Sequence, residues 1–123
     1  MKRARISYQG AVHAVTQAAS GRVRLADGRL LQESEVQWLP PVVAGTVFAL
    51  GLNYADHAKE LAFKAPEVPL VFLKGPNALV GHRAQTRRPA DATYMHYECE
   101  LAVVIGKTGY QVSKENAMEL VAG

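Results

Sequence analysis

Two consecutive prolines, Pro40 and Pro41, constrain the fold of this chain more than any other feature of the sequence. Proline has no backbone N–H group, so it can neither continue a helix nor pair in the middle of a β-sheet. Regular structure must therefore stop at this point. We expect a small β module over residues 1–44 and a second unit over residues 45–123, which carries the residues suited to chemistry.

The module before the prolines is expected to contain two β-hairpins. Turns are predicted at Gln9-Gly10 and at Asp27-Gly28, because glycine and its polar neighbours tolerate the positive φ angles of a tight turn. Loosely alternating apolar residues flank both turns. The strands are expected at residues 3–8, 11–15, 22–25 and 29–31.

The second unit has apolar, β-branched runs that predict three short buried strands. Helices are expected from Tyr54 to about Phe63, after a cap at Asn53, and from Lys114 to about Val121. Residues 81–93 are polar and are expected to form a loop. The fold class is therefore mainly β with short helices (α+β). The three strands are expected at Thr46–Leu50, Leu70–Leu73 and Tyr97–Ile105.

Two glutamates, Glu98 and Glu100, lie one residue apart at the start of the third of these runs. Side chains at positions i and i+2 of a strand leave the same face, so the two carboxylates would point together and Cys99 away, as buried filler. Neighbouring carboxylates suit a hard cation such as Mg²⁺, Mn²⁺ or Ca²⁺. Taken alone, the pair is better explained by a solvated strand face, because Glu-x-Glu is a weak signal.

Three further side chains are candidates for a catalytic site. His57 and Glu60 lie three residues apart on the expected helix, where the carboxylate can orient the imidazole for proton transfer. Lys74 ends an apolar strand and could bind a substrate carboxylate. A plain solvated helix face and a lysine extending from the sheet edge into water are the alternatives.

The composition argues against several functional classes. Lys and Arg outnumber Asp and Glu by only 14 to 11, and no basic run is longer than two residues, so nucleic-acid binding is not expected. No apolar stretch approaches the roughly 20 residues that span a bilayer. Cys99 is the sole cysteine, which excludes an internal disulfide and fits the cytoplasm.

Three stretches occur together in an order and spacing that resembles the fumarylacetoacetate hydrolase family. They are Gly51–Glu60, Pro69–Lys74 and Tyr97–Gly106, and the resemblance covers residues 45–123. The runs Val36–Pro41 and Tyr94–Glu100 are similar to one branch of that family, whose enzymes decarboxylate and isomerise intermediates of the homoprotocatechuate pathway.

The resemblance implies a fold of stacked sheets, a homodimer, and a divalent cation, Mg²⁺ or Mn²⁺, held by three carboxylates. Glu98 and Glu100 match two of those carboxylates, and His57 and Glu60 match the His–Glu pair of a short lid helix. The third carboxylate, an aspartate, and a catalytic lysine are expected beyond residue 123, so the catalytic fold is expected to be incomplete here.

The function implied is a metal-dependent decarboxylase and isomerase of 2-oxo or 2-hydroxydienoic diacids in aromatic catabolism. A small keto-diacid is the expected partner, with neither nucleic acid nor membrane. Acylpyruvate hydrolysis and oxaloacetate decarboxylation are alternatives within the same family. The alternative that is not an enzyme is a catalytically inactive fragment.

Overall fold

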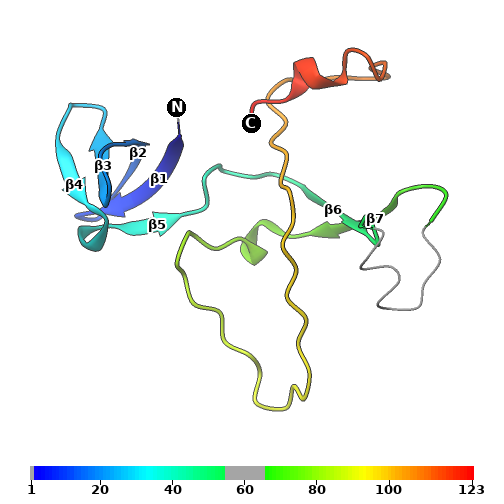
Figure 1. Cartoon of the computed structure of the whole chain (residues 1–123), viewed down its shortest axis with the longest axis horizontal. Coiled ribbons are helices and arrows are strands. Elements are labelled where there is room, and N and C mark those ends of the chain that lie inside the picture. Colours follow the sequence, from blue (N-terminus) through cyan, green and yellow to red (C-terminus); the bar gives the residue numbers. More distant parts are fainter. Residues whose placement is uncertain (1, 55–65) are drawn as a thin grey trace. The chain divides into compact units, whose positions relative to one another are not determined.

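The computed structural model describes residues 2–54 and 66–123. These residues fall into two compact units, divided between Thr86 and Arg87, and each unit is described by itself (Figure 1). The expected boundary near residue 44 stays a prediction. Most of the helix expected at 54–63 lies outside the described residues.

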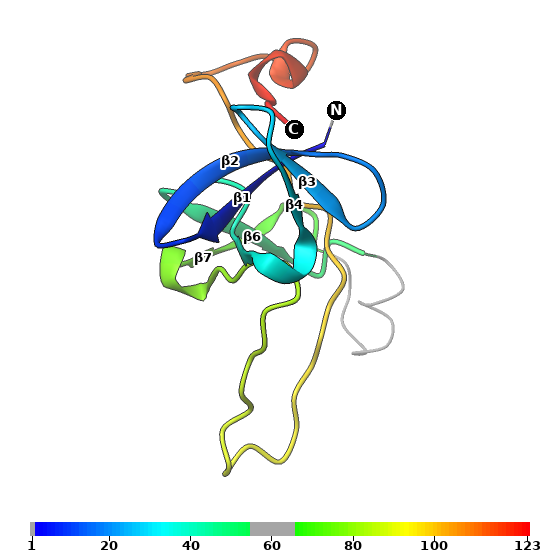
Figure 2. The same ribbon diagram turned by 90° about the vertical axis from the view of Figure 1, so that its left-hand side faces the viewer.

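The first unit begins with a five-stranded antiparallel sheet of order β4-β3-β2-β1-β5, which is strongly curled (Figure 2). Both predicted hairpins are confirmed, and β5 joins the outer edge of β1 through the register pair Ile6↔Trp38. The strands are β1 (Arg3–Tyr8), β2 (Ala11–Gln17), β3 (Arg22–Leu25), β4 (Leu30–Gln32) and β5 (Gln37–Leu39). A short 3₁₀ helix, η1 (Glu33–Glu35), connects β4 to β5.

The hairpin turns have the backbone angles that their residues favour. Gln9 and Gly10 have φ angles of 48° and 78°, which is the left-handed pair of a two-residue hairpin turn. In the second turn Gly28 has φ of 89°, and the Asp27 carboxylate accepts hydrogen bonds from the Arg29 backbone N–H at 3.0 Å and from Arg29 Nε at 2.8 Å. Local turn chemistry thus sets the register of both hairpins.

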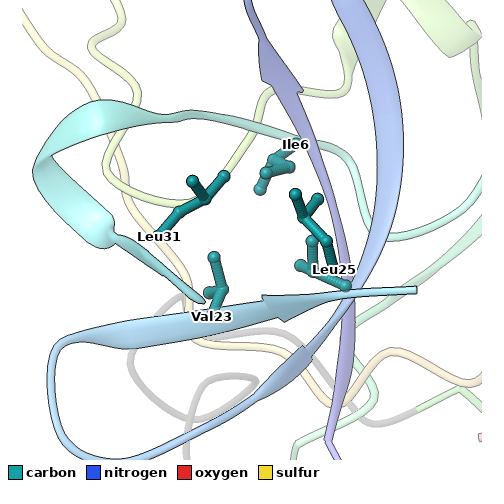
Figure 3. Packing of buried hydrophobic residues seen from close by; sticks show 5 residues of the cluster. Ile6, Val23, Leu25 and Leu31 are labelled. Atoms are coloured by element: carbon teal, nitrogen blue, oxygen red, sulfur yellow. The ribbon is translucent and has the colours of Figure 1, made fainter. Parts of the chain in front are cut away.

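The curled sheet encloses a small apolar core (Figure 3). Ile6 on β1 is fully buried, and the cross-strand pairs Val15↔Leu25 and Val23↔Leu31 surround it from β2, β3 and β4. Alternate residues of each strand point inward, as the period of two in a β-strand requires. This core is the best-packed part of the described chain.

After the prolines, the first unit continues as a two-stranded antiparallel ribbon. The strands β6 (Val47–Gly51) and β7 (Leu70–Lys74) confirm two of the three strands expected in this region. Their expected burial is wrong, because Phe48 is 68% exposed and Leu73 65% exposed. Each strand has one hydrogen-bonded neighbour among the described residues, and alternate residues of β6 are half-buried while all of β7 is exposed. The 3₁₀ helix η2 (Pro76–Ala78) follows β7.

The second unit contains little regular structure. The strand expected at Tyr97–Ile105 is wrong: the described chain shows one isolated bridge there, Ile105↔Val121. Hydrogen bonds join Val104 N–H to the Gly123 carbonyl at 2.7 Å and Gly106 N–H to the Leu120 carbonyl at 2.8 Å. Within the described residues no strand ladder forms over residues 97–103, and a strand requires a paired neighbour.

The helix expected from Lys114 to Val121 is also wrong in extent. A turn at residues 114–116 leads into the 3₁₀ helix η3 (Ala117–Leu120). An isolated helix this short is unstable without a buried apolar face, and Met118 is 75% exposed. Within the described residues, no helix has the length and apolar character needed to cross a membrane.

Candidate functional site

Lys74 lies at the end of the β6–β7 ribbon through which both of its strands connect to the β module. It pairs with Val47 in the antiparallel register, and its side chain is exposed. Lys74 Nζ lies 5.8 Å from the centroid of the Phe72 ring, which is within the range of a cation–π contact. The ammonium group is therefore accessible to a carboxylate from solvent.

Glu98 and Glu100 lie in the second unit, on an exposed segment that rises without a turn in Figure 1. Just before the glutamates, the side chains of Tyr94 and His96 lie on the same side of the backbone, because their rings are in contact at a centroid distance of 4.6 Å. Contact between residues two apart is typical of extended backbone, in which alternate side chains share a face. Continuation of this alternation would place Glu98 and Glu100 on one face, and their common face stays a prediction.

The carboxylate chemistry of Glu98 and Glu100 fits a hard divalent cation, since both offer oxygen donors two residues apart. Within residues 2–54 and 66–123, no group of three or more His, Cys, Asp or Glu side chains is arranged to hold a metal ion. The assignment of Glu98 and Glu100 as metal ligands therefore stays a prediction. Cys99, expected to be buried, is exposed, and its segment has no sheet neighbour among the described residues.

The other candidates are distributed between the two units. His57 and Glu60 lie outside the described residues, so their pairing stays a prediction. Lys74 belongs to the first unit, and Glu98 and Glu100 belong to the second. Each of these roles therefore stays a prediction as well.

The sequence reasoning missed a group of contacts that joins the loop after β7 to the β module. Arg83 Nη1 lies 3.0 Å from Glu33 Oε2, and the ring of His82 packs edge-on against Trp38 with centroids 5.6 Å apart. Residues 81–93 were expected to be a solvated loop, and most of them are exposed. The lone tryptophan of the sequence was the feature that could have indicated these contacts, because a large aromatic side chain usually packs against other residues.

Comparison with known proteins identifies relatives of this chain. The profile described as fumarylacetoacetate (FAA) hydrolase C-terminal matches residues 46–123. A 4-hydroxyphenylacetate degradation bifunctional isomerase/decarboxylase from Salmonella dublin is 52% identical over 99 residues, which cover 80% of this chain and 23% of that protein. The homoprotocatechuate catabolism bifunctional isomerase/decarboxylase of Escherichia coli is 63% identical over 79 residues, which cover 64% of this chain and 18% of that protein.

A solved structure shows the same fold. The 5-carboxymethyl-2-hydroxymuconate delta-isomerase of Mycobacterium smegmatis matches with a TM-score of 0.80 and 35% identity over all of this chain and 51% of that chain. The present chain therefore spans half of that structure and less than a quarter of the two curated relatives.

These relatives are enzymes, and enzymes of their family generally depend on a divalent metal ion and act on small molecules. The resemblance of the sequence motifs is confirmed, and so is the mainly β fold class with few helices. The profile matches well over half of the residues, from the start of β6 to the last residue. The chain belongs to the fumarylacetoacetate hydrolase family.

Proposed function

We propose that the protein containing this chain is a divalent-metal-dependent isomerase and decarboxylase of 2-hydroxydienoic and 2-oxo diacids. The protein would act in the breakdown of 4-hydroxyphenylacetate and homoprotocatechuate. The observation that carries this proposal is the 63% identity over 79 residues with a bifunctional isomerase/decarboxylase of that catabolism. The cytoplasm and a homodimer are the proposed compartment and assembly.

Glu98 and Glu100 would hold the cation, Mg²⁺ or Mn²⁺, through their carboxylate oxygens. Their exposure and the extended backbone that the Tyr94–His96 ring contact indicates just before them support this assignment. When bound, such a cation acts as a Lewis acid toward the oxygens of a 2-oxo acid and stabilises developing negative charge. Further ligands would have to come from other parts of the protein, because the described residues offer no third one.

The remaining candidates would handle the substrate and its protons. The exposed Lys74 ammonium would bind a substrate carboxylate as a point charge. His57 would move the proton that is transferred during isomerisation, and Glu60 would hold the imidazole in the required orientation. Isomerisation removes a proton from one carbon and returns it to another through an enolate, whereas decarboxylation breaks a C–C bond, releases CO₂ and leaves an enolate that is then protonated. Both reactions therefore need stabilisation of the enolate and a group that moves the proton.

The test is an absorbance assay with the protein expressed from its whole reading frame. A conjugated 2-hydroxydienoic diacid loses its ultraviolet absorbance when it is isomerised or decarboxylated. We expect this loss to require Mg²⁺ or Mn²⁺, to stop with EDTA, and to fall at least a hundredfold in the Glu98→Gln and Glu100→Gln variants, about 2.7 kcal/mol of transition-state stabilisation. The exposed Glu119→Gln is the matched control and should keep full activity.

A second candidate function is tautomerisation of a simple 2-oxo diacid. A mitochondrial oxaloacetate tautomerase from Bos taurus is 40% identical over 95 residues, which cover 76% of this chain and 30% of that protein. The two functions share the enolisation step but differ in the substrate. Turnover of oxaloacetate together with no reaction of the dienoic diacid would favour this second function over the first.

A further inference from the structure

Residues 81–83 connect back to the β module through three contacts of different kinds. The backbone of Gly81 packs directly on β5, so that a Cβ atom built on Gly81 would overlap the Trp38 carbonyl oxygen. The His82 ring lies edge-on to the Trp38 ring, at an interplanar angle of 82°. The Arg83 guanidinium pairs with the Glu33 carboxylate of η1 at 3.0 Å. We call this group of contacts the clasp.

The clasp closes the base of the β6–β7 ribbon. The chain leaves the module after Leu39, and Val47 begins β6 opposite Lys74, the last residue of β7. From Lys74 the chain returns through η2 to the clasp, only seven positions later, at Gly81. Both connections of the ribbon to the module therefore meet at β5, and Lys74 is the ribbon residue nearest to them along the chain.

From this arrangement we propose that the clasp residues Gly81, His82 and Arg83 are positioning residues for Lys74. The β module, which carries no candidate catalytic residue itself, would then contribute to substrate binding by fixing where the Lys74 ammonium lies. The inference rests on the proposed function, in which Lys74 binds a carboxylate of the substrate.

Several features favour positioning over incidental packing. The link from Lys74 to Gly81 is short and structured, because Ala78 N–H donates to the Gly75 carbonyl at 2.9 Å and Leu79 N–H to the Pro76 carbonyl at 3.2 Å. On the proposed arrangement, a displacement at the clasp would move the end of β7 through this short link. The Glu33 side chain is only 25% exposed, so its pairing with Arg83 is partly shielded from water.

The decisive variants are Gly81→Ala and its matched control Gly45→Ala, each made in the protein expressed from its whole reading frame. A methyl group on Gly81 must displace the segment from the Trp38 carbonyl, whereas no atom of the described residues lies within 4 Å of a Cβ atom on Gly45. We expect Gly81→Ala to raise KM for the diacid about tenfold with kcat little changed, because Lys74 binds substrate and transition state alike. Gly45→Ala should leave both constants unchanged.

A second pair of variants tests the ion pair alone. Arg83→Gln should raise KM about two- to fivefold, as expected for loss of a partly exposed ion pair, and exposed Arg88→Gln should not. In a Lys74→Gln background, Gly81→Ala and Arg83→Gln should have no further effect on KM. Such non-additivity is the signature of residues that act through Lys74, and a general loss of stability would not produce it.

A measurement independent of activity separates this inference from the proposed function. After reductive ¹³C-methylation, the Lys74 resonance should shift and sharpen in Gly81→Ala and stay in place in Gly45→Ala. An unmoved resonance would overturn the inference, as would an additive KM effect in the Lys74→Gln background. An inactive wild-type protein whose Lys74 resonance still responds to Gly81→Ala would instead refute the proposed function and leave the positioning in place.

Discussion

Truncation of Ile6 to alanine tests whether the five-residue core holds the β module together. Ile6 is 0% exposed and is the largest fully buried side chain of the described residues. Removing its buried methyl and methylene groups should cost about 2–5 kcal/mol, because the atoms lose their burial and the surrounding strands close the cavity only in part. A module of roughly 40 residues has a total free energy of unfolding of only about 2–6 kcal/mol.

Ile6→Ala should therefore leave the module largely unfolded at 25 °C. The assay is thermal and urea unfolding followed by the fluorescence of Trp38, which is the lone tryptophan of these 123 residues and packs against this core. The matched control is Val12→Ala on β2, a position that is 60% exposed and should change stability by less than about 1 kcal/mol. Equal unfolding midpoints for the two variants would refute the assignment of the core.

Three further predictions follow from turn geometry, charge and metal dependence. Gly28→Ala should lower the free energy of unfolding by about 1 kcal/mol, because Gly28 has φ of 89°, and calorimetry should show a smaller loss in Gly45→Ala. Hydrogen bonds from the Arg29 backbone N–H and then from its guanidinium lower the pKa of Asp27 below the usual 3.8. The stabilisation from Asp27 is thus present above that value and lost as the pH falls through the folded pKa, and an NMR titration of the carboxyl carbon should give a midpoint below 3.8. Activity removed by EDTA should return with Mg²⁺ or Mn²⁺, and an enzyme that keeps full activity in EDTA would contradict the metal assignment.

Local signals were sufficient to predict the β module. Gly10 and Gly28 adopt the positive φ angles that their turns require, and the apolar alternation around them gives the observed register. The edge strand β5 was missed because three residues before a Pro-Pro pair carry too little periodicity to predict a strand. Short-range chemistry thus determines hairpins, whereas an edge strand depends on a partner far away in sequence.

The second unit shows the limit of the same reasoning. The run from Tyr97 to Ile105 has strong β propensity, but a strand forms only where a neighbour supplies hydrogen bonds, and Val104 finds one at Gly123. Tyr97 is 96% exposed and Leu101 82% exposed, because no second layer covers them in the described chain. Sequence propensity identifies such a segment, and tertiary partners decide its structure.

The candidate site was predicted from motifs rather than from geometry. Glu98 and Glu100 were chosen for their spacing, and the Tyr94–His96 ring contact agrees with the alternation that this choice needs. The Glu33–Arg83 pair was beyond prediction, since its members lie 50 positions apart and no local pattern relates them. Contacts of this kind become visible only when the chain is folded.

Cation binding by Glu98 and Glu100 is the central claim, and titration calorimetry with Mn²⁺ tests it most directly. The protein expressed from its whole reading frame should bind one Mn²⁺ ion per chain, and Glu98→Gln and Glu100→Gln should each weaken the affinity at least tenfold, about 1.4 kcal/mol. The Glu119→Gln control should bind as the wild type does. Unchanged Mn²⁺ affinity in both site variants would contradict the account.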